Sequence, residues 1–262
     1  MKQDYDKNLK ELKEVINKSK RITFLTGAGV STNSGIPDYR SANGIYSKNP
    51  EIMLSRSYKD KCYYTFMDFI RNKFDFKNAK PNNIHKWIAN LEANHDVTVI
   101  TQNIDSLHEE AGSTNVIHFH GDIKQWKCLS CGKIYDFDYI KSNSYCECEG
   151  KLESSIVLYG DNIDQENDRL AREALWKSDL VIVIGTSLIV FPFAGLIEEV
   201  NPYFSEDVTT LVLLNKEDTV NYSNSFDIKI LDDASNVIKK WKIRFKKRKF
   251  YNRYKEWRYI NA

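Results

Sequence analysis

The stretch that decides the fold is RITFLTGAGVSTNSGIPDYRS, residues 21–41. Its first six residues, Arg21–Thr26, form a short apolar run that is typical of a buried β-strand. The turn Gly27-Ala28-Gly29 follows at once, and glycines at such a strand end let the backbone approach a pyrophosphate near a helix N-terminus. Gly-x-Gly alone is equally consistent with a simple tight turn, because the third glycine of the usual dinucleotide fingerprint is missing.

Further strand-sized apolar runs recur along the chain, at residues 97–101, 116–120, 155–158, 180–184, 210–214 and 226–231. Several lack polar alternation, which indicates strands that are buried on both faces of a parallel sheet. Helices are expected between them, at 83–94, 105–111, 168–177 and 193–200, after a first helix over 4–18. This alternation predicts an α/β fold with a Rossmann-like doubly wound parallel sheet.

Two stretches do not fit this alternation, so we expect them to be insertions that form a smaller lobe. The Rossmann-like dinucleotide-binding domain would then comprise residues 1–37, 81–120 and 155–235. A helical insert would cover 38–80 and a cysteine-containing ribbon insert 121–154. A basic, aromatic C-terminal extension would follow over 236–262.

Four of the five cysteines lie in the second insertion, as Cys128-x-x-Cys131 and Cys146-x-Cys148. Two close thiol pairs suit a tetrahedral zinc ion, although the second pair is one residue shorter than usual. Unrelated core cysteines are the alternative, but packing rarely produces two close pairs in one loop. Four protein ligands leave no open coordination position, so we expect one structural zinc ion rather than a catalytic one.

The 262 residues include 42% hydrophobic and 28% charged residues and carry a net charge of +2. No apolar run has the length of a membrane helix, and the N-terminal residues lack the apolar core of a signal peptide, so we expect a cytoplasmic location. Between Lys239 and Arg258, eleven residues are basic and only Glu256 is acidic. This tail predicts an arm for nucleic acid or another anionic partner, or else, as we favour, a helix docked by its aromatic residues.

Polar residues follow several of the expected strands. Thr101-Gln102-Asn103-Ile104-Asp105 ends one strand, and its side chains would need partners if buried. Gly185-Thr186-Ser187-Leu188 follows the strongest apolar run, and Asn215 and Asp233-Ala234 follow the last two strands. Because parallel strands form a ligand crevice at their carboxyl ends, we expect these residues to face a nucleotide.

The segment His118-Phe119-His120-Gly121 ends another expected strand. Both histidines would share one face of that strand, so spacing alone leaves either as the functional one. The glycine after His120 leaves space beside the ring, which favours His120 as a general base in the crevice. The other histidines have no such context, and we expect ordinary surface or packing roles for His85, His95 and His108.

Taken in this order, the motifs resemble those of the sirtuin family over about residues 21–238. Residues 27–41 are similar to the family signature almost residue for residue. The series continues with 101–105, Leu107-His108, His120-Gly121, the cysteine quartet, 185–188, Val190, Pro192 and Asn215. The chain departs from the family pattern at Ser106, where glycine is usual, at the short second cysteine pair, and at Asp161, where glutamate is common.

The resemblance implies an NAD-dependent protein deacylase that removes acetyl or another uncharged acyl group from lysine and yields nicotinamide and O-acyl-ADP-ribose. His120 would be the base, with Asn103 and Asp105 also in catalytic positions. The acyl-lysine peptide would add as a strand between Leu158-Tyr159-Gly160 and Ile189-Val190. The resemblance also implies NAD contacts from Gly27, Ala28, Gly29, Asp38, Tyr39, Arg40, Gln102, Asn103, Asp105, Gly185, Thr186, Ser187, Asn215, Asp233 and Ala234.

Other functions would use the same motifs differently. A sirtuin-like ADP-ribosyltransferase or NAD glycohydrolase would keep the NAD site, and a non-catalytic NAD-sensing scaffold would leave His120 unexplained. A hydride-transfer dehydrogenase is poorly supported because the three-glycine fingerprint is absent. Relatives that remove acidic acyl groups carry a Tyr and an Arg that hold the carboxylate. The spacing of Tyr63, Tyr64 and Arg71 does not match that pair, which favours an uncharged acyl group.

Overall fold

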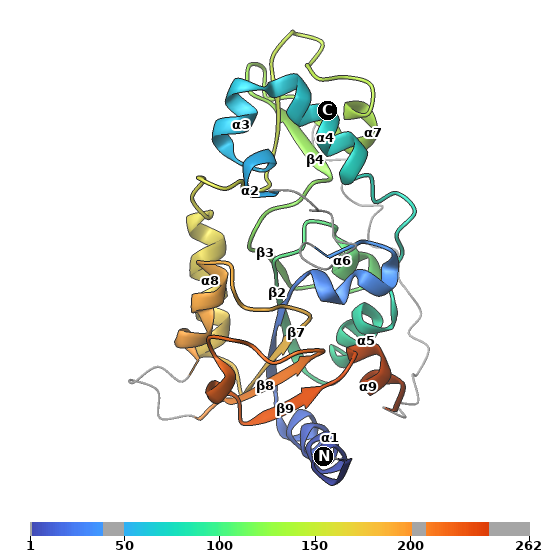
Figure 1. Ribbon diagram of the computed structural model, residues 1–262, viewed down its shortest axis with the longest axis vertical. Coiled ribbons are helices and arrows are strands. Elements are labelled where there is room, and N and C mark those ends of the chain that lie inside the picture. The colour runs from blue at the N-terminus through green and yellow to red at the C-terminus, as the bar shows by residue number, and fades with distance from the viewer. Residues whose placement is uncertain (1, 39–49, 201–207, 241–262) are drawn as a thin grey trace.

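A six-stranded parallel sheet forms the centre of the larger lobe (Figure 1). The computed structural model describes residues 2–38, 50–200 and 208–240. The strand order is β3-β2-β1-β7-β8-β9, which is the order of a Rossmann-like sheet. The strands are β1 (Arg21–Thr26), β2 (Asp96–Thr101), β3 (Val116–His118), β7 (Leu180–Ile184), β8 (Thr210–Asn215) and β9 (Ile228–Leu231). The predicted doubly wound α/β fold is therefore confirmed.

Each face of this sheet is covered by helices, because side chains alternate between the two faces along every strand. On one face, Phe24 of β1 and Ile182 of β7 pack against the helices α1 (Lys2–Lys18), α5 (Asn83–Leu91) and α9 (Ala234–Lys240). On the other face, Leu25 and Val183 pack against α8 (Gln165–Trp176) and the 3₁₀ helix η3 (Phe193–Glu199). Burial on both faces explains the apolar runs in the sequence.

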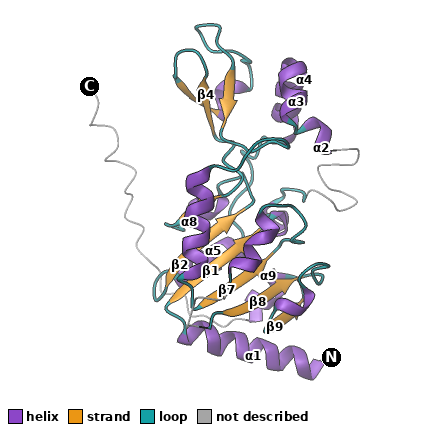
Figure 2. Cartoon of the chain, turned by 90° about the vertical axis from the view of Figure 1, so that its left-hand side faces the viewer, coloured by secondary structure: helices purple, strands orange, loops and turns teal. Residues whose placement is uncertain are grey.

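The two insertions form one smaller lobe, which lies above the sheet in Figures 1 and 2. The first contributes α2 (Pro50–Met53), α3 (Arg56–Lys61) and α4 (Tyr63–Lys73). The second contributes α7 (Phe137–Ile140) and an antiparallel sheet of β4 (Gln125–Cys128), β5 (Ile134–Asp136) and β6 (Leu152–Ser154). Their apolar side chains share one core, which includes Phe66, Met67 and Trp126.

Buried and partly buried hydrogen bonds join the two insertions. The hydroxyl of Tyr63 donates to the carbonyls of Ser144 and Leu152, at 2.7 and 3.0 Å. The guanidinium of Arg71 donates to the Ile140 carbonyl and to the Ser144 hydroxyl. Both side chains therefore connect α4 to the second insertion.

Several predicted elements differ from the structure in their bounds by one to three residues, and three others differ in ways that bear on the site. The strand predicted at 116–120 ends at His118, because Gly121 closes a turn by donating to the His118 carbonyl at 3.1 Å. The strand predicted at 155–158 is absent from the described residues, and β6 lies just before it in the smaller sheet. Within that run, Ile156 and Leu158 are buried beside the cavity described below rather than in a sheet, while Ser155 is exposed. The helix predicted at 193–200 is η3, a 3₁₀ helix.

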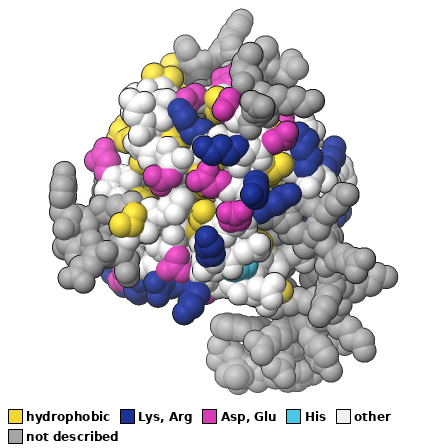
Figure 3. All heavy atoms as spheres, turned by 90° about the horizontal axis from the view of Figure 1, so that it is seen from below, with side chains coloured by type: hydrophobic (Ala, Val, Ile, Leu, Met, Phe, Trp, Pro, Cys, Tyr) yellow, Lys and Arg dark blue, Asp and Glu magenta, His cyan; other side chains and the backbone are white. Residues whose placement is uncertain are grey.

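The charged residues on the face below the sheet are of both signs (Figure 3). Within the described ranges, no helix combines the length and apolar character that crossing a membrane requires. The basic extension predicted over 236–262 begins inside α9, whose Val237 and Ile238 pack into the sheet core. Residues 241–262 lie outside the described residues, so the role of the tail stays a prediction.

Gly121 lies where the chain turns from β3 toward the smaller lobe, with a φ of +80°. A Cβ atom at this position would lie 2.0 Å from the Ser155 carbonyl oxygen. We expect Gly121→Ala to lower the free energy of unfolding by about 3 kcal/mol or more, since it combines left-handed strain with a backbone clash.

Gly35 provides the matched control, because its φ is +84° and nothing lies within 4 Å of an added Cβ. Gly35→Ala should cost only the conformational strain, about 1 kcal/mol. Urea denaturation of the two variants measures the difference. Equal destabilisation would contradict the assigned clash.

Candidate active site

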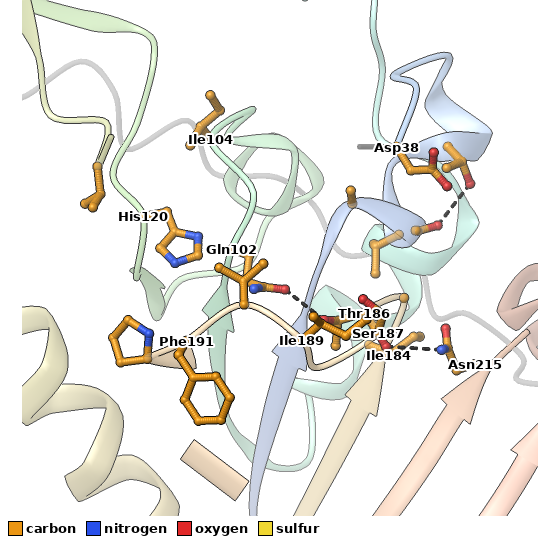
Figure 4. Close-up of a pocket in the computed structure, with 18 of the residues that line it drawn as sticks. Asp38, Gln102, Ile104, His120, Ile184, Thr186, Ser187, Ile189, Phe191 and Asn215 are labelled. Carbon is orange, nitrogen blue, oxygen red and sulfur yellow. Dashed lines mark hydrogen bonds between the residues drawn. The ribbon is translucent and has the colours of Figure 1, made fainter. Parts of the chain in front are cut away.

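A cavity of about 690 Å³ lies at the carboxyl ends of the sheet strands, beside the smaller lobe (Figure 4). A cavity of this volume suits a large ligand. It brings together most of the predicted site residues. Those that line it are Ala28, Gly29, Asp38, Gln102, His120, Leu158, Tyr159, Gly160, Gly185, Thr186, Ser187, Ile189, Val190, Asn215, Asp233 and Ala234. Tyr39 and Arg40 lie outside the described residues.

Two glycine turns form the floor of the cavity by direct backbone contact. The Gly29 N–H donates to the Gly185 carbonyl at 2.8 Å, and a Cβ on Gly29 would lie 2.8 Å from the Gly185 Cα. Gly27 does not line the cavity, and a Cβ there would lie 2.7 Å from the Thr186 Cβ. The glycine at position 27 therefore allows close packing of the turns, and its predicted pyrophosphate contact stays a prediction.

Asn103 and Asp105 face a small recess that shares Ala28 and Ile104 with the main cavity. The Ser31 hydroxyl donates to the Asp105 carboxylate at 2.6 Å. The Asn103 amide donates to Ser31 and to the Gly27 carbonyl, at 3.1 Å each. Burial raises the pKa of Asp105 above its usual value. The recess therefore presents a connected set of buried polar groups.

Ser31 and His85 are functional candidates that the sequence reasoning missed. His85 is fully buried, and its Nε2 lies 3.4 Å from the Ser31 hydroxyl. His108 is also buried, with its Nε2 3.2 Å from the Thr26 hydroxyl, whereas His95 contacts the Ser19 carbonyl. Burial lowers the pKa of His85 to about 4 and that of His108 below its usual value, so both rings are neutral. No sequence spacing connects residues 31 and 85, because only the fold brings them together.

The structure separates the two histidines that spacing left equivalent. His120 lies past the end of β3 and lines the cavity (Figure 4). His118 is absent from the cavity lining, and its Nε2 contacts the Glu109 carboxylate. Burial lowers the pKa of His120 to about 4, against the opposing effect of a hydrogen bond with the Gln102 backbone. The His120 ring is thus neutral at pH 7 and able to accept a proton.

The cavity wall near His120 is apolar and includes Ile104, Ile156 and Val157. Among the described residues that line the cavity, Lys216 is the sole Lys or Arg, and it pairs with Asp233 at 3.1 Å. Tyr63 and Arg71 bind the second insertion instead, as described above. The cavity therefore suits an uncharged acyl group better than an acidic one.

The four cysteines of the second insertion meet at one point, with their sulfur atoms within 4.8 Å of one another. The Cys128–Cys148 and Cys131–Cys146 sulfur pairs are each 3.5 Å apart, close to the roughly 3.8 Å expected between ligands of a tetrahedral zinc ion. Hydrogen bonds from the Cys148 N–H and from Tyr135 lower the pKa of Cys146, while hydrogen bonds with the other thiols of the quartet raise that of Cys148. Metal binding requires all four as thiolates. The quartet fits one structural zinc ion.

A Rossmann-like sheet, a glycine-floored cavity and a zinc-type lobe together define a dinucleotide-binding protein with a histidine in its cleft. A profile of the Sir2 family matches residues 27–192, and the chain belongs to that family.

Relatives and solved structures agree with this assignment. An NAD-dependent protein deacetylase of Listeria monocytogenes is 44% identical over 72% of this chain and 83% of its own length. One of Clostridium acetobutylicum is 41% identical over 88% of this chain and 96% of its own. A solved Sir2 structure with a deacetylated p53 peptide and 3'-O-acetyl-ADP-ribose has a TM-score of 0.80, 32% identity, and coverage of 89% of this chain and 98% of its own. One with a p53 peptide and NAD⁺ has a TM-score of 0.77, 32% identity, and coverage of 88% and 96%.

The cysteine quartet predicts a zinc dependence of stability. Removing the metal with a chelator, or replacing Cys146 by Ser, should lower Tm by roughly 5–15 °C, since the smaller lobe then loses its central cross-link. Elemental analysis should find one zinc per chain. Cys62→Ser is the control, because Cys62 lies outside the quartet. An unchanged Tm after chelation would contradict a structural metal.

Proposed function

We propose that this protein is an NAD-dependent lysine deacylase that acts on acetyl or another uncharged acyl group. The observation that carries the proposal is a neutral imidazole, His120, in the same cavity as two glycine turns suited to a dinucleotide. The names of the relatives and the ligands of the similar structures support it. Asn103, Asp105 and Ser31 would hold the carboxamide of the nicotinamide in their recess.

In the proposed reaction, NAD, His120, the apolar side chains and the cysteine quartet have different roles. When bound, NAD supplies a ribose carbon that the acyl oxygen attacks as nicotinamide leaves. His120 would accept a proton from a ribose hydroxyl, and its lowered pKa leaves the imidazole unprotonated at pH 7, which this role requires. Apolar side chains such as Ile104 and Ile156 would exclude water from the reacting atoms. The cysteine quartet would hold the smaller lobe and take no part in the reaction.

The acyl-lysine peptide would bind as an added strand between Leu158-Tyr159-Gly160 and Ile189-Val190. Both segments line the cavity, and Tyr159 and Ile189 are exposed. This mode of binding uses backbone hydrogen bonds for affinity and places alternate side chains in the cleft. We further propose the cytoplasm as its location, since a cysteine quartet kept as thiols suits a reducing compartment.

An ADP-ribosyltransferase or NAD glycohydrolase would use the same NAD site. A requirement for an acyl-lysine substrate therefore distinguishes the proposed deacylase from both. We expect nicotinamide release from NAD to require an acetyl-lysine peptide, with O-acetyl-ADP-ribose formed in equal amount. Mass spectrometry of both products, with the unacetylated peptide as control, makes the test. Rapid nicotinamide release without any acyl peptide would favour the hydrolase instead.

The lowered pKa of His120 predicts an unusually wide pH range of activity. Because protonation removes the base and the pKa is about 4, kcat/KM should stay level from pH 8 to pH 6 and fall only as pH approaches that value. His120→Ala should lower kcat by about 10²–10⁴-fold.

His118→Ala is the matched control, since that ring faces Glu109 rather than the cavity, and it should retain deacylation. Circular dichroism at each pH separates loss of activity from unfolding. Full activity of the His120→Ala variant would exclude this residue as the base.

A further inference from the structure

Four charged side chains meet where the smaller lobe contacts the proposed substrate segment Leu158-Tyr159-Gly160. Arg56 donates to both carboxylate oxygens of Asp161, at 2.7 and 2.9 Å. Arg56 also donates to Glu153 of β6 at 2.5 Å, as does Lys59. Arg56 thus links α3 in two directions, toward β6 through Glu153 and toward the substrate segment through Asp161.

The backbone beside Arg56 already occupies one edge of the substrate segment. The Arg56 N–H donates to the Tyr159 carbonyl at 2.9 Å, and the Tyr159 N–H donates to the Leu54 carbonyl at 2.8 Å. The residues on either side of Tyr159 do not contact this backbone. Both peptide groups of Leu158 bind Asp161, and Gly160 lies in the turn between them.

Asp161 closes the turn that follows Tyr159. Its carboxylate accepts the Leu158 N–H at 3.1 Å, and its own N–H donates to the Leu158 carbonyl at 2.9 Å. The turn places Gly160 at a φ of +95°, and among the described residues the Gly160 peptide groups make no hydrogen bond. Burial alone would raise the pKa of Asp161, but the hydrogen bonds from Arg56 and Leu158 hold it below its usual value. The carboxylate is therefore ionised when it binds both groups.

We propose that Arg56 is a positioning residue for the peptide substrate. Through Asp161 it holds the turn at residues 158–161 in the conformation that leaves the Gly160 peptide groups open to an added strand. This inference rests on the proposed peptide deacylation. Arg56 contacts neither the NAD side of the cavity nor His120, so its loss should affect peptide binding and leave the chemical step intact.

The competing explanation is that the cluster only joins parts of the smaller lobe. The two ion pairs of Arg56 distinguish these roles. Asp161→Asn removes the negative charge that pairs with Arg56 beside the substrate segment, while Glu153→Gln removes the negative charge that pairs with Arg56 in β6. Asp161→Glu keeps the charge, and Arg169→Gln breaks an exposed ion pair on α8 that serves as a general control.

Steady-state kinetics with an acetyl-lysine peptide and NAD test the proposal, together with Tm for each variant. We expect Asp161→Asn and Arg56→Gln to raise the peptide KM about fivefold to tenfold, with kcat and the KM for NAD close to wild type. Asp161→Glu should recover most of the peptide affinity. Glu153→Gln should lower Tm without raising the peptide KM, and Arg169→Gln should change neither.

Fluorescence anisotropy with a labelled acetyl-lysine peptide gives a readout that does not depend on turnover. Weaker binding by Asp161→Asn supports the inference even if the wild-type protein turns over no peptide, in which case the proposed function alone fails. An unchanged peptide KM and affinity for Asp161→Asn and Arg56→Gln would overturn the inference. An equal rise in the peptide KM for Glu153→Gln would also overturn it, because the cluster would then only join parts of the smaller lobe.

Discussion

The close contact between two backbone turns is the constraint on which the site depends. The turn after β1 meets the turn after β7 through the Gly29–Gly185 hydrogen bond, and a single added carbon on either side would separate them. Because β1 and β7 are neighbours at the middle of the sheet, this contact fixes the two central strand ends relative to each other. The cavity floor, the position of Thr186 and the approach of Gln102 all follow from that spacing.

For three of the histidines near the site, burial changes the pKa more than any charged neighbour does. The rings of His85, His108 and His120 are all held neutral by burial. His118, by contrast, has a raised pKa because Glu109 stabilises its charged form more than burial opposes it. The pKa values of two histidines only two residues apart are therefore shifted in opposite directions, since one faces a carboxylate and the other faces an apolar cleft.

The parts of the fold that the sequence predicted well are those that burial alone determines. The run at 180–184 matches β7 at both ends, because every residue in it is buried between two helical layers. The cysteine spacing likewise predicted a cluster that the fold does assemble. The run at 155–158 was wrongly predicted as a strand. Its buried residues, Ile156 and Leu158, lie beside the cavity, and apolar composition does not distinguish that position from one in a sheet. The contacts of Ser31 with His85 and of Arg56 with Asp161 could not be predicted, because each joins positions that are distant along the chain.

The way in which Tyr63 and Arg71 join the two insertions has a consequence for folding kinetics. Their partners, Ser144 and Leu152, lie far along the chain, with β2 and β3 of the large sheet between them. Closing so long a loop costs entropy before any contact between the two insertions can form. We therefore expect these contacts to form late, after the sheet has brought the two segments together. Loss of the hydrogen bonds from Tyr63 or Arg71 should then accelerate unfolding and leave the rate of refolding nearly unchanged.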